Sequence, residues 1–291
     1  MYNSIFDFCA VKNTGGAHRN GDKELPNRVK FLISLIEKLN LKYDLDTFPE
    51  ERHSYFKDDP DFERFFRGKK SWWNQEKEIQ KEIGNNFHNI YLPGSSPYMI
   101  IAHHDIVNPS ADNANDNSAS VINCLAYKLI NPSINVVITD GEEPPSGGAG
   151  AKQLSKKIKE DYFGNITGVL NLELTGVGGE NFFIGNYPGN LYNKLIDIFD
   201  PIVVDTPFND SATLRSNGID SVVVTTVPII KKEDTKHKGY GFRPINREID
   251  LGENEMDFSI LYRSHTKEDS VDKISIEDMK SFVEKILTKI F

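Results

Sequence analysis

Short apolar runs that each end in acidic or histidine residues constrain the fold of this chain more than any other feature. Three such runs occur, with their motifs: 98–101 before Ala102-His103-His104-Asp105, 136–139 before Asp140-Gly141-Glu142-Glu143, and 168–170 before Asn171-Leu172-Glu173. Helix-like segments at 118–130 and 151–159 lie between the runs. Short buried strands that alternate with helices are typical of α/β proteins with a parallel sheet. We therefore expect an α/β fold in which the three motifs meet beyond the carboxyl ends of the strands.

The rest of the chain extends this pattern. Residues 26–41 carry apolar side chains at helical spacing, with Pro26 suited to the first turn. A closing helix is expected from Ser275, because its apolar residues form one face. Further expectations are a helix at 191–199, strands at 182–184 and 221–226, and a long surface loop at 229–258. No internal repeat is found, and residues 1–291 are interpreted as a single domain.

Residues 50–88 interrupt the pattern and are interpreted as an insertion into that domain. They are charged, lack strand periodicity and are rich in aromatic residues: Tyr55, Phe56, Phe62, Phe65, Phe66, Trp72 and Trp73. Aromatic side chains usually bury against their own domain, which favours a packed helical insertion. The alternative is a lid that faces the substrate.

Composition excludes several classes of protein. A formal net charge of -9 argues against a nucleic-acid partner, because phosphate binding needs clustered Lys and Arg. No apolar run approaches membrane-spanning length, and the first residues lack the pattern of a signal peptide. Two cysteines, Cys9 and Cys124, do not make a disulfide framework. We expect a cytoplasmic protein that binds neither nucleic acid nor membrane.

The residue types in the motifs are those of a metal site. Imidazole nitrogens and carboxylate oxygens suit zinc. His103 and Asp105 can lie on one side of the chain, so that Asp105 accepts the second imidazole N–H, whereas His104 points the other way and is expected to be structural or solvent-facing. Of the adjacent Glu142 and Glu143, one can bind a metal while the other stays free for proton transfer.

Two more motifs complete a known pattern. These are Asn115-Asp116-Asn117-Ser118 before a helical segment and His265-Thr266-Lys267-Glu268-Asp269 near the end. Over about residues 86–291, the chain resembles the M28 family of co-catalytic zinc metallopeptidases. The resemblance implies a three-layer α/β/α fold with a central mixed, largely parallel sheet.

The same resemblance implies residue roles. One metal ion would take His103 and Glu173, a second would take Glu143 and His265, and Asp116 would bridge the two. Glu142 would be the general base and Asp105 the partner of His103. Two residues depart from the family: Glu173 stands where many members have Asp, and Ser211 stands where many have a histidine at the pocket edge.

The expected function is that of a metallo-aminopeptidase with two divalent ions, expected to be zinc. Such a site generates hydroxide at neutral pH, which attacks the N-terminal peptide bond of a peptide substrate while Glu142 moves the proton. Three alternatives remain: a single-zinc glutaminyl cyclase, a carboxypeptidase or amidohydrolase on the same scaffold, and a non-catalytic binding module. The complete set of ligands with Glu142 argues against the last.

Overall fold

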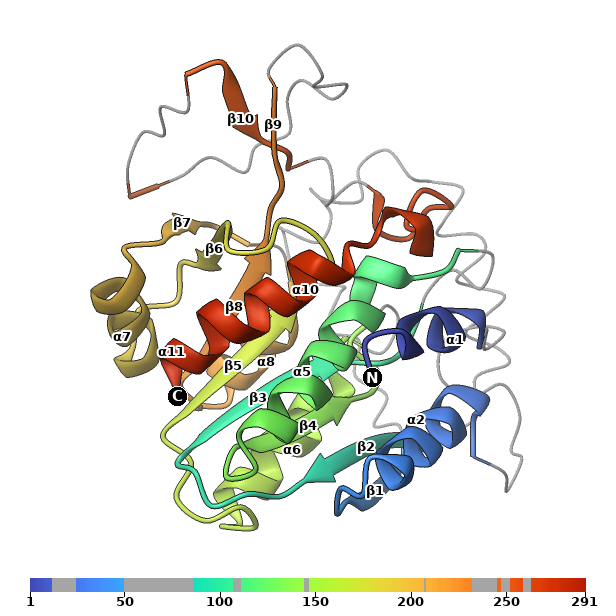
Figure 1. The fold of residues 1–291 in the computed structure, drawn as a ribbon. Coiled ribbons are helices and arrows are strands. Elements are labelled where there is room, and N and C mark those ends of the chain that lie inside the picture. Colours follow the sequence, from blue (N-terminus) through green and yellow to red (C-terminus); the bar gives the residue numbers. More distant parts are fainter. Residues whose placement is uncertain are drawn as a thin grey trace.

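In the part of the chain that the structure describes, a central mixed sheet of eight strands forms the body of the protein (Figure 1). The computed structural model describes residues 1–11, 25–49, 86–106, 111–143, 147–206, 208–231, 245–246, 252–258 and 263–291. Across the sheet the strands are β1 (Asp44–Pro49), β2 (Asn86–Leu92), β4 (Asn135–Thr139), β3 (Tyr98–His103), β5 (Gly168–Glu173), β8 (Ser221–Thr226), β6 (Phe182–Gly185) and β7 (Ile202–Val204).

The middle of the sheet is parallel and its two sides bring in antiparallel pairs. Strands β4, β3, β5 and β8 lie side by side in this order and run parallel to one another. The pairs β1–β2, β2–β4 and β6–β8 are antiparallel. The mixed, largely parallel sheet expected above is therefore confirmed.

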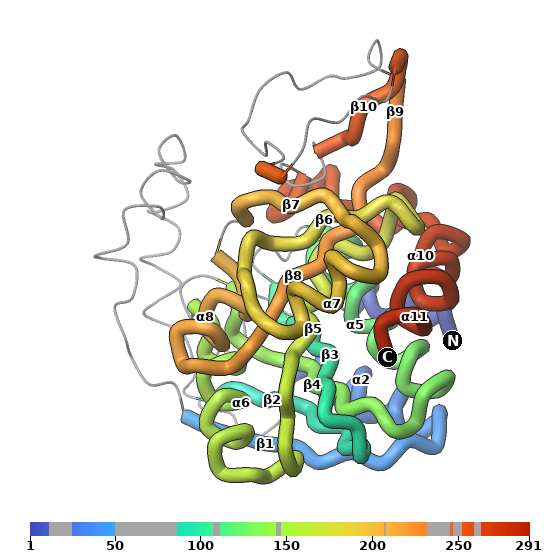
Figure 2. Tube along the Cα trace, turned by 90° about the vertical axis from the view of Figure 1, so that its left-hand side faces the viewer, coloured from blue at the N-terminus to red at the C-terminus, as the bar shows by residue number. Residues whose placement is uncertain are grey.

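Helices cover both faces of the sheet (Figures 1 and 2). The helices whose apolar residues join the larger core cluster are α1 (Ser4–Ala10), α2 (Asn27–Lys38), α5 (Ala119–Ile130), α7 (Asn190–Phe199), α10 (Ile276–Phe282) and α11 (Thr288–Ile290). The opposite face carries α6 (Ala149–Lys159) and α8 (Asp210–Ser216). The three-layer α/β/α arrangement follows.

Alternation along the strands produces the two cores. In β3, Ile100 and Ala102 pack into the larger cluster, whereas Met99 and Ile101 pack against α6 and α8. All four are fully buried, because successive side chains of a strand point to opposite faces and both faces are covered. Each large apolar side chain buried in this way contributes about 1.5–3 kcal/mol to folding.

Most of the expected elements are present. Helices α2, α5, α6 and α7 form at the expected places, and Ser275 caps α10 by accepting the N–H of Asp278. In the part of the chain that the structure describes, no helix is long and apolar enough to span a membrane.

Two boundaries differ from the expectation. Part of the expected surface loop 229–258 forms a two-stranded ribbon, in which β9 (Ile229–Lys231) pairs antiparallel with β10 (Asn254–Met256). The expected insertion 50–88 ends too late, because residues 86–88 already pair with β1 as the start of β2. Residues 50–85, with both tryptophans, lie outside the described residues, so the prediction of an insertion or lid stays untested.

Candidate metal site

The sheet brings the sequence motifs to one edge. His103 and Glu173 are the last residues of β3 and β5, and Glu142 and Glu143 follow β4. The parallel register aligns His103 with Thr139, the last residue of β4. From β3 the chain passes to β4 on one side and later to β5 on the other, so this edge is the switch point where open α/β sheets bind ligands.

Asp116 reaches the same edge from a turn between β3 and α5, which we call the Asp116 turn (Ala114–Ser118). Both carboxylate oxygens of Asp269 accept main-chain N–H groups of this turn, from Asn115 at 2.7 Å and from Asp116 at 3.0 Å. Asp269 is 3% exposed, so this contact is shielded from water. It ties the turn to the chain segment that carries His265.

The side chain of Asn117 connects the Asp116 turn to the end of β5. Its amide nitrogen donates to the carbonyl oxygen of Leu172 at 2.8 Å, and its amide oxygen accepts the N–H of Leu174 at 3.2 Å. These two main-chain groups flank Glu173, and Asn117 itself follows Asp116. Asn117 therefore fixes the two carboxylates relative to each other.

The carboxylate of Asp116 lies between the two histidines. Its Oδ1 atom is 3.2 Å from His103 Nε2, and its Oδ2 atom is 3.2 Å from His265 Nε2. Glu173 Oε2 lies 3.5 Å from His103 Nε2, and Glu143 Oε2 lies 2.9 Å from His265 Nε2. Among the described residues, three groups of three ligand atoms could hold a metal ion. Two of them share Asp116, and the third consists of His103, Glu142 and Glu143.

These spacings suit metal ions. Four ligand atoms at about 2.0 Å around a tetrahedral zinc ion are separated from one another by about 3.3 Å. The histidine-to-carboxylate distances of 2.9 to 3.5 Å fall around this value in both groups. The residues therefore fit one cation in each group, with Asp116 common to both.

Charges in the site couple its histidines to its carboxylates. Burial opposes protonation of His103 and His265, but neighbouring carboxylates outweigh it, chiefly Glu173 for the first and Glu143 for the second. The pKa of His103 thus lies well above its ordinary value, and that of His265 rises to about 10. Burial alone would raise the pKa of Asp116, yet hydrogen bonds from both histidines hold it well below its usual range.

Glu142 lies beside these groups without belonging to either of the two that share Asp116. Its Oε2 atom is 3.9 Å from His103 Nε2. Burial raises the pKa of Glu142 well above its ordinary value; the charge of His103 opposes the shift and that of Glu143 adds to it. This carboxyl group therefore has a high proton affinity next to the candidate ligands.

Asp105 contacts both the histidine and the glutamate pair. Its Oδ1 atom lies 3.4 Å from His103 Nδ1, without hydrogen-bond geometry. The same carboxylate accepts the main-chain N–H of Glu142 at 3.3 Å and of Glu143 at 2.9 Å. It thus holds the loop after β4 against the end of β3.

His104 and Ser211 are both buried. The ring of His104 is 2% exposed, with Nε2 3.1 Å from the carbonyl oxygen of His88, so it is structural and not solvent-facing. The hydroxyl of Ser211 lies 2.9 Å from that of Ser221 in the interior.

Sequence reasoning assigned no role to Asp210, Asn117 or Asp269. Asp210 accepts a hydrogen bond from Thr139 at 2.6 Å, and burial raises its pKa to about 7. The positions of Asn117 beside Asp116, and of Asp269 four residues after His265, were the available signals.

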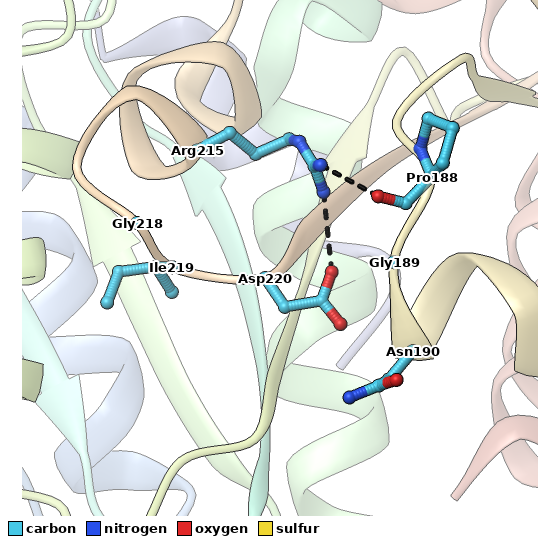
Figure 3. A pocket seen from close by; sticks show the side chains of 7 residues that line it. All are labelled: Pro188, Gly189, Asn190, Arg215, Gly218, Ile219 and Asp220. Carbon is cyan, nitrogen blue, oxygen red and sulfur yellow. Dashed lines mark hydrogen bonds and ion pairs between the residues drawn. The ribbon is translucent and has the colours of Figure 1, made fainter.

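A shallow cavity of about 340 Å³ lies elsewhere, next to the amino end of β8 (Figure 3). Its charged residues already satisfy each other: Arg215 lies 3.4 Å from Asp220, which also accepts the N–H of Leu191 at the start of α7. The carboxyl-edge cluster remains the candidate functional site.

The comparison with protein families agrees with this geometry. A model described as Peptidase family M28 matches residues 89–289. The chain belongs to this family. The resemblance seen in the motifs is thereby confirmed. No curated protein sequence matches the chain.

Solved structures of similar fold include aminopeptidases and glutaminyl cyclases. An aminopeptidase from Aneurinibacillus sp. strain AM-1 aligns with a TM-score of 0.61 at 12% identity, covering 97% of this chain and 90% of that one. BSAP, a zinc aminopeptidase from Bacillus subtilis, aligns with a TM-score of 0.59 at 14% identity, covering 97% of this chain and 91% of that one. A glutaminyl cyclase from Porphyromonas gingivalis aligns with a TM-score of 0.63 at 14% identity, covering 99% of this chain and 95% of that one. At these identities the likeness shows the fold alone.

Proposed function

We propose that this protein is a metal-dependent aminopeptidase that hydrolyses the N-terminal bond of peptides with two divalent ions, expected to be zinc. The observation that carries the proposal is the position of Asp116, whose two carboxylate oxygens face His103 and His265 at 3.2 Å each. A carboxylate that serves two histidine-containing groups is suited to two ions and not one. The zinc aminopeptidase among the similar structures supports the choice of reaction and metal.

The proposed ligands are His103, Glu173, Glu143 and His265, with Asp116 shared. When bound, the ions would lower the pKa of a water molecule and polarise the peptide carbonyl group. The protein would hold the ligands in place through Asp269, Asn117 and Asp105, and the ligands would lose their protons as the ions bind. Peptide is the proposed partner.

Glu142 is the proposed general base. Its raised pKa gives it the proton affinity to take a proton from water, and its place beside the ligands lets it pass that proton to the leaving amine. General acid–base catalysis of this kind contributes about 10²–10⁴-fold to the rate. Asp105 would support this step by fixing the main chain on which Glu142 stands.

Glutaminyl cyclase activity is the second candidate. It is favoured by the glutaminyl cyclases from an Acidobacteriales bacterium and Porphyromonas gingivalis, which align with TM-scores of 0.62 and 0.63. A cyclase would use a single zinc ion. In its reaction the α-amine of an N-terminal glutamine attacks the side-chain amide carbon of the same residue, and ammonia is released. The shared position of Asp116 argues for two ions and hence for the peptidase.

A panel of peptides separates the candidates. Zinc-loaded protein would be incubated with free-amine peptides, N-blocked peptides and peptides that begin with glutamine, and the products would be identified by mass spectrometry. Release of N-terminal residues from the free-amine peptides alone is expected. Pyroglutamate formation would establish the cyclase, and cleavage of N-blocked peptides would indicate a carboxypeptidase or amidohydrolase.

A further inference from the structure

A fully buried arginine lies behind the candidate metal site. Arg28, in the first turn of α2, is 1% exposed, and its guanidinium carbon lies 3.9 Å from the ring centroid of Phe8 in α1. Its Nη1 atom also donates to the carbonyl oxygens of Phe8 and Val11, each at 3.4 Å. One side of the guanidinium group is thus held by the N-terminal helix.

The same guanidinium group holds the end of β3. Its Nε atom donates to the carbonyl oxygen of His104 at 2.8 Å. The N–H of His104 donates to the carbonyl oxygen of Thr139 at 2.9 Å. The residue directly after His103 is therefore fixed through both of its main-chain groups, which sets the point from which the His103 ring extends.

A third arm of the guanidinium group reaches the Asp116 turn. Arg28 Nη2 donates to Ser118 Oγ at 2.9 Å, and Ser118 Oγ donates to the carbonyl oxygen of Asn113 at 2.7 Å. Asn113 has a left-handed backbone with φ of 50° and directly precedes the turn. Arg28 and Ser118 therefore fix the two ends of the segment that presents Asp116.

The acceptors of Arg28 are main-chain carbonyls and a hydroxyl group. Among the described residues, no carboxylate forms an ion pair with it. A planar fork with five donors can reach several acceptors at fixed angles, which a lysine ammonium group cannot do. The hydrogen bonds of Arg28 therefore fix the positions of the main-chain segments that it contacts, more than they neutralise a charge.

We infer that Arg28 is a positioning residue that sets the spacing between His103 and Asp116 and thereby the affinity of the site for metal. The inference rests on the proposed function, because it takes these two residues as ligands. Arg28 lies before residues 89–289, where the family model matches, so the N-terminal segment completes a site otherwise built by that region.

The test compares two buried cations in the full-length protein. Lys128 is also buried, and its ammonium group donates to the carbonyl oxygens of Pro93, Pro132 and Ile134 at 2.7 to 2.8 Å, but it stands near the end of α5 away from the ligands. Arg28→Lys and Lys128→Met would each be measured for melting temperature without metal and for zinc affinity by competition with a chromogenic chelator.

Both variants are expected to melt below the wild type, but only Arg28→Lys should bind zinc more weakly, by about 10- to 100-fold, as when the partners of metal ligands are removed. The visible absorption of bound Co²⁺ should change in the same variant alone. A folded Arg28→Lys protein with wild-type zinc affinity overturns the inference. A wild-type protein that binds no zinc instead removes the proposed function.

A milder variant decides the case in which Arg28→Lys does not fold. Ser118→Ala removes only the hydroxyl that links Arg28 to Asn113. It should also weaken zinc binding. If both single variants fold, the double variant should lose less zinc-binding free energy than the sum of the two single losses, because the residues act through one contact. Wild-type affinity in Ser118→Ala, or full additivity, contradicts the inference.

Discussion

Asp269 accepts the main-chain N–H of Asp116 at 3.0 Å, across 153 residues of sequence. Its second oxygen accepts the N–H of the preceding residue, Asn115. Burial, with the charge of Asp116 adding to it, raises the pKa of Asp269 to about 7. Because Asp269 also lies four residues after His265, the contact joins two proposed ligands through one carboxylate.

Asp269→Asn should therefore loosen the metal site. The amide group keeps one acceptor, and its NH₂ group then faces a main-chain N–H, so at least one of the two hydrogen bonds is lost. We expect zinc affinity to fall about 10-fold or more and stability to fall by about 1–3 kcal/mol. Competition with a chelator and chemical unfolding measure the two effects.

Asp272→Asn is the matched control for that variant. Asp272 belongs to the same segment, but its side chain is 68% exposed and pairs with Lys273. Asp272→Asn should change neither zinc affinity nor the free energy of unfolding appreciably, since exposed ion pairs contribute little to stability. Zinc affinity that falls equally in both variants would show that the segment, and not the Asp269 contact, is responsible.

The two adjacent glutamates should separate in their effects. Glu142→Gln should keep both metal ions and lower turnover by about 10²-fold or more, because it removes the proposed base and leaves the ligands. Glu143→Gln should weaken metal binding as well as activity, because Glu143 lies 2.9 Å from His265 in the ligand group. Metal content and kcat would be measured for each, and equal metal retention in both would refute the division of roles.

The stability of the metal-free protein should fall as pH rises from 5 to 8. Burial, although opposed by His265, raises the pKa of Glu143 to about 7. The charge of Glu143 in turn keeps the pKa of His265 at about 10 despite burial. In this window the folded protein binds more protons than the unfolded chain, so the free energy of unfolding decreases with pH. The low pKa of Asp116 acts only at more acidic pH.

Melting temperatures in chelator at pH 5.5 and 8 test this dependence. Added zinc should raise the melting temperature more at pH 8, because its ligands must be deprotonated to bind. A melting temperature in chelator that increases between the two pH values would contradict the charge coupling within the site.

The sequence predicted the ligand positions better than the contacts that hold them. Buried apolar runs placed His103 and Glu173 at strand ends, because such runs are distinctive in a sheet covered on both faces. The contact of Arg28 with His104 spans 76 residues and uses a main-chain carbonyl group, so no local pattern reveals it. Asp269 escaped assignment for the same reason.

The edges of the fold were also hard to predict. Strand β1 has the sequence Asp-Leu-Asp-Thr-Phe-Pro, and only Phe48 in it is buried, so it lacks the apolar run that marked the central strands. The ribbon of β9 and β10 is exposed to partly buried and lies within a charged segment. In both places main-chain pairing, and not side-chain burial, determines the strand.

The number of metal ions per chain tests the central claim most directly. Metal-free protein would be titrated with zinc, separated from free metal and analysed for zinc and protein content. The geometry around Asp116 predicts two ions per chain, and Asp116→Asn should reduce the binding of both, because the residue contacts both histidines. A stoichiometry that stays at one under saturating zinc would contradict the two-ion site and move the assignment to a glutaminyl cyclase.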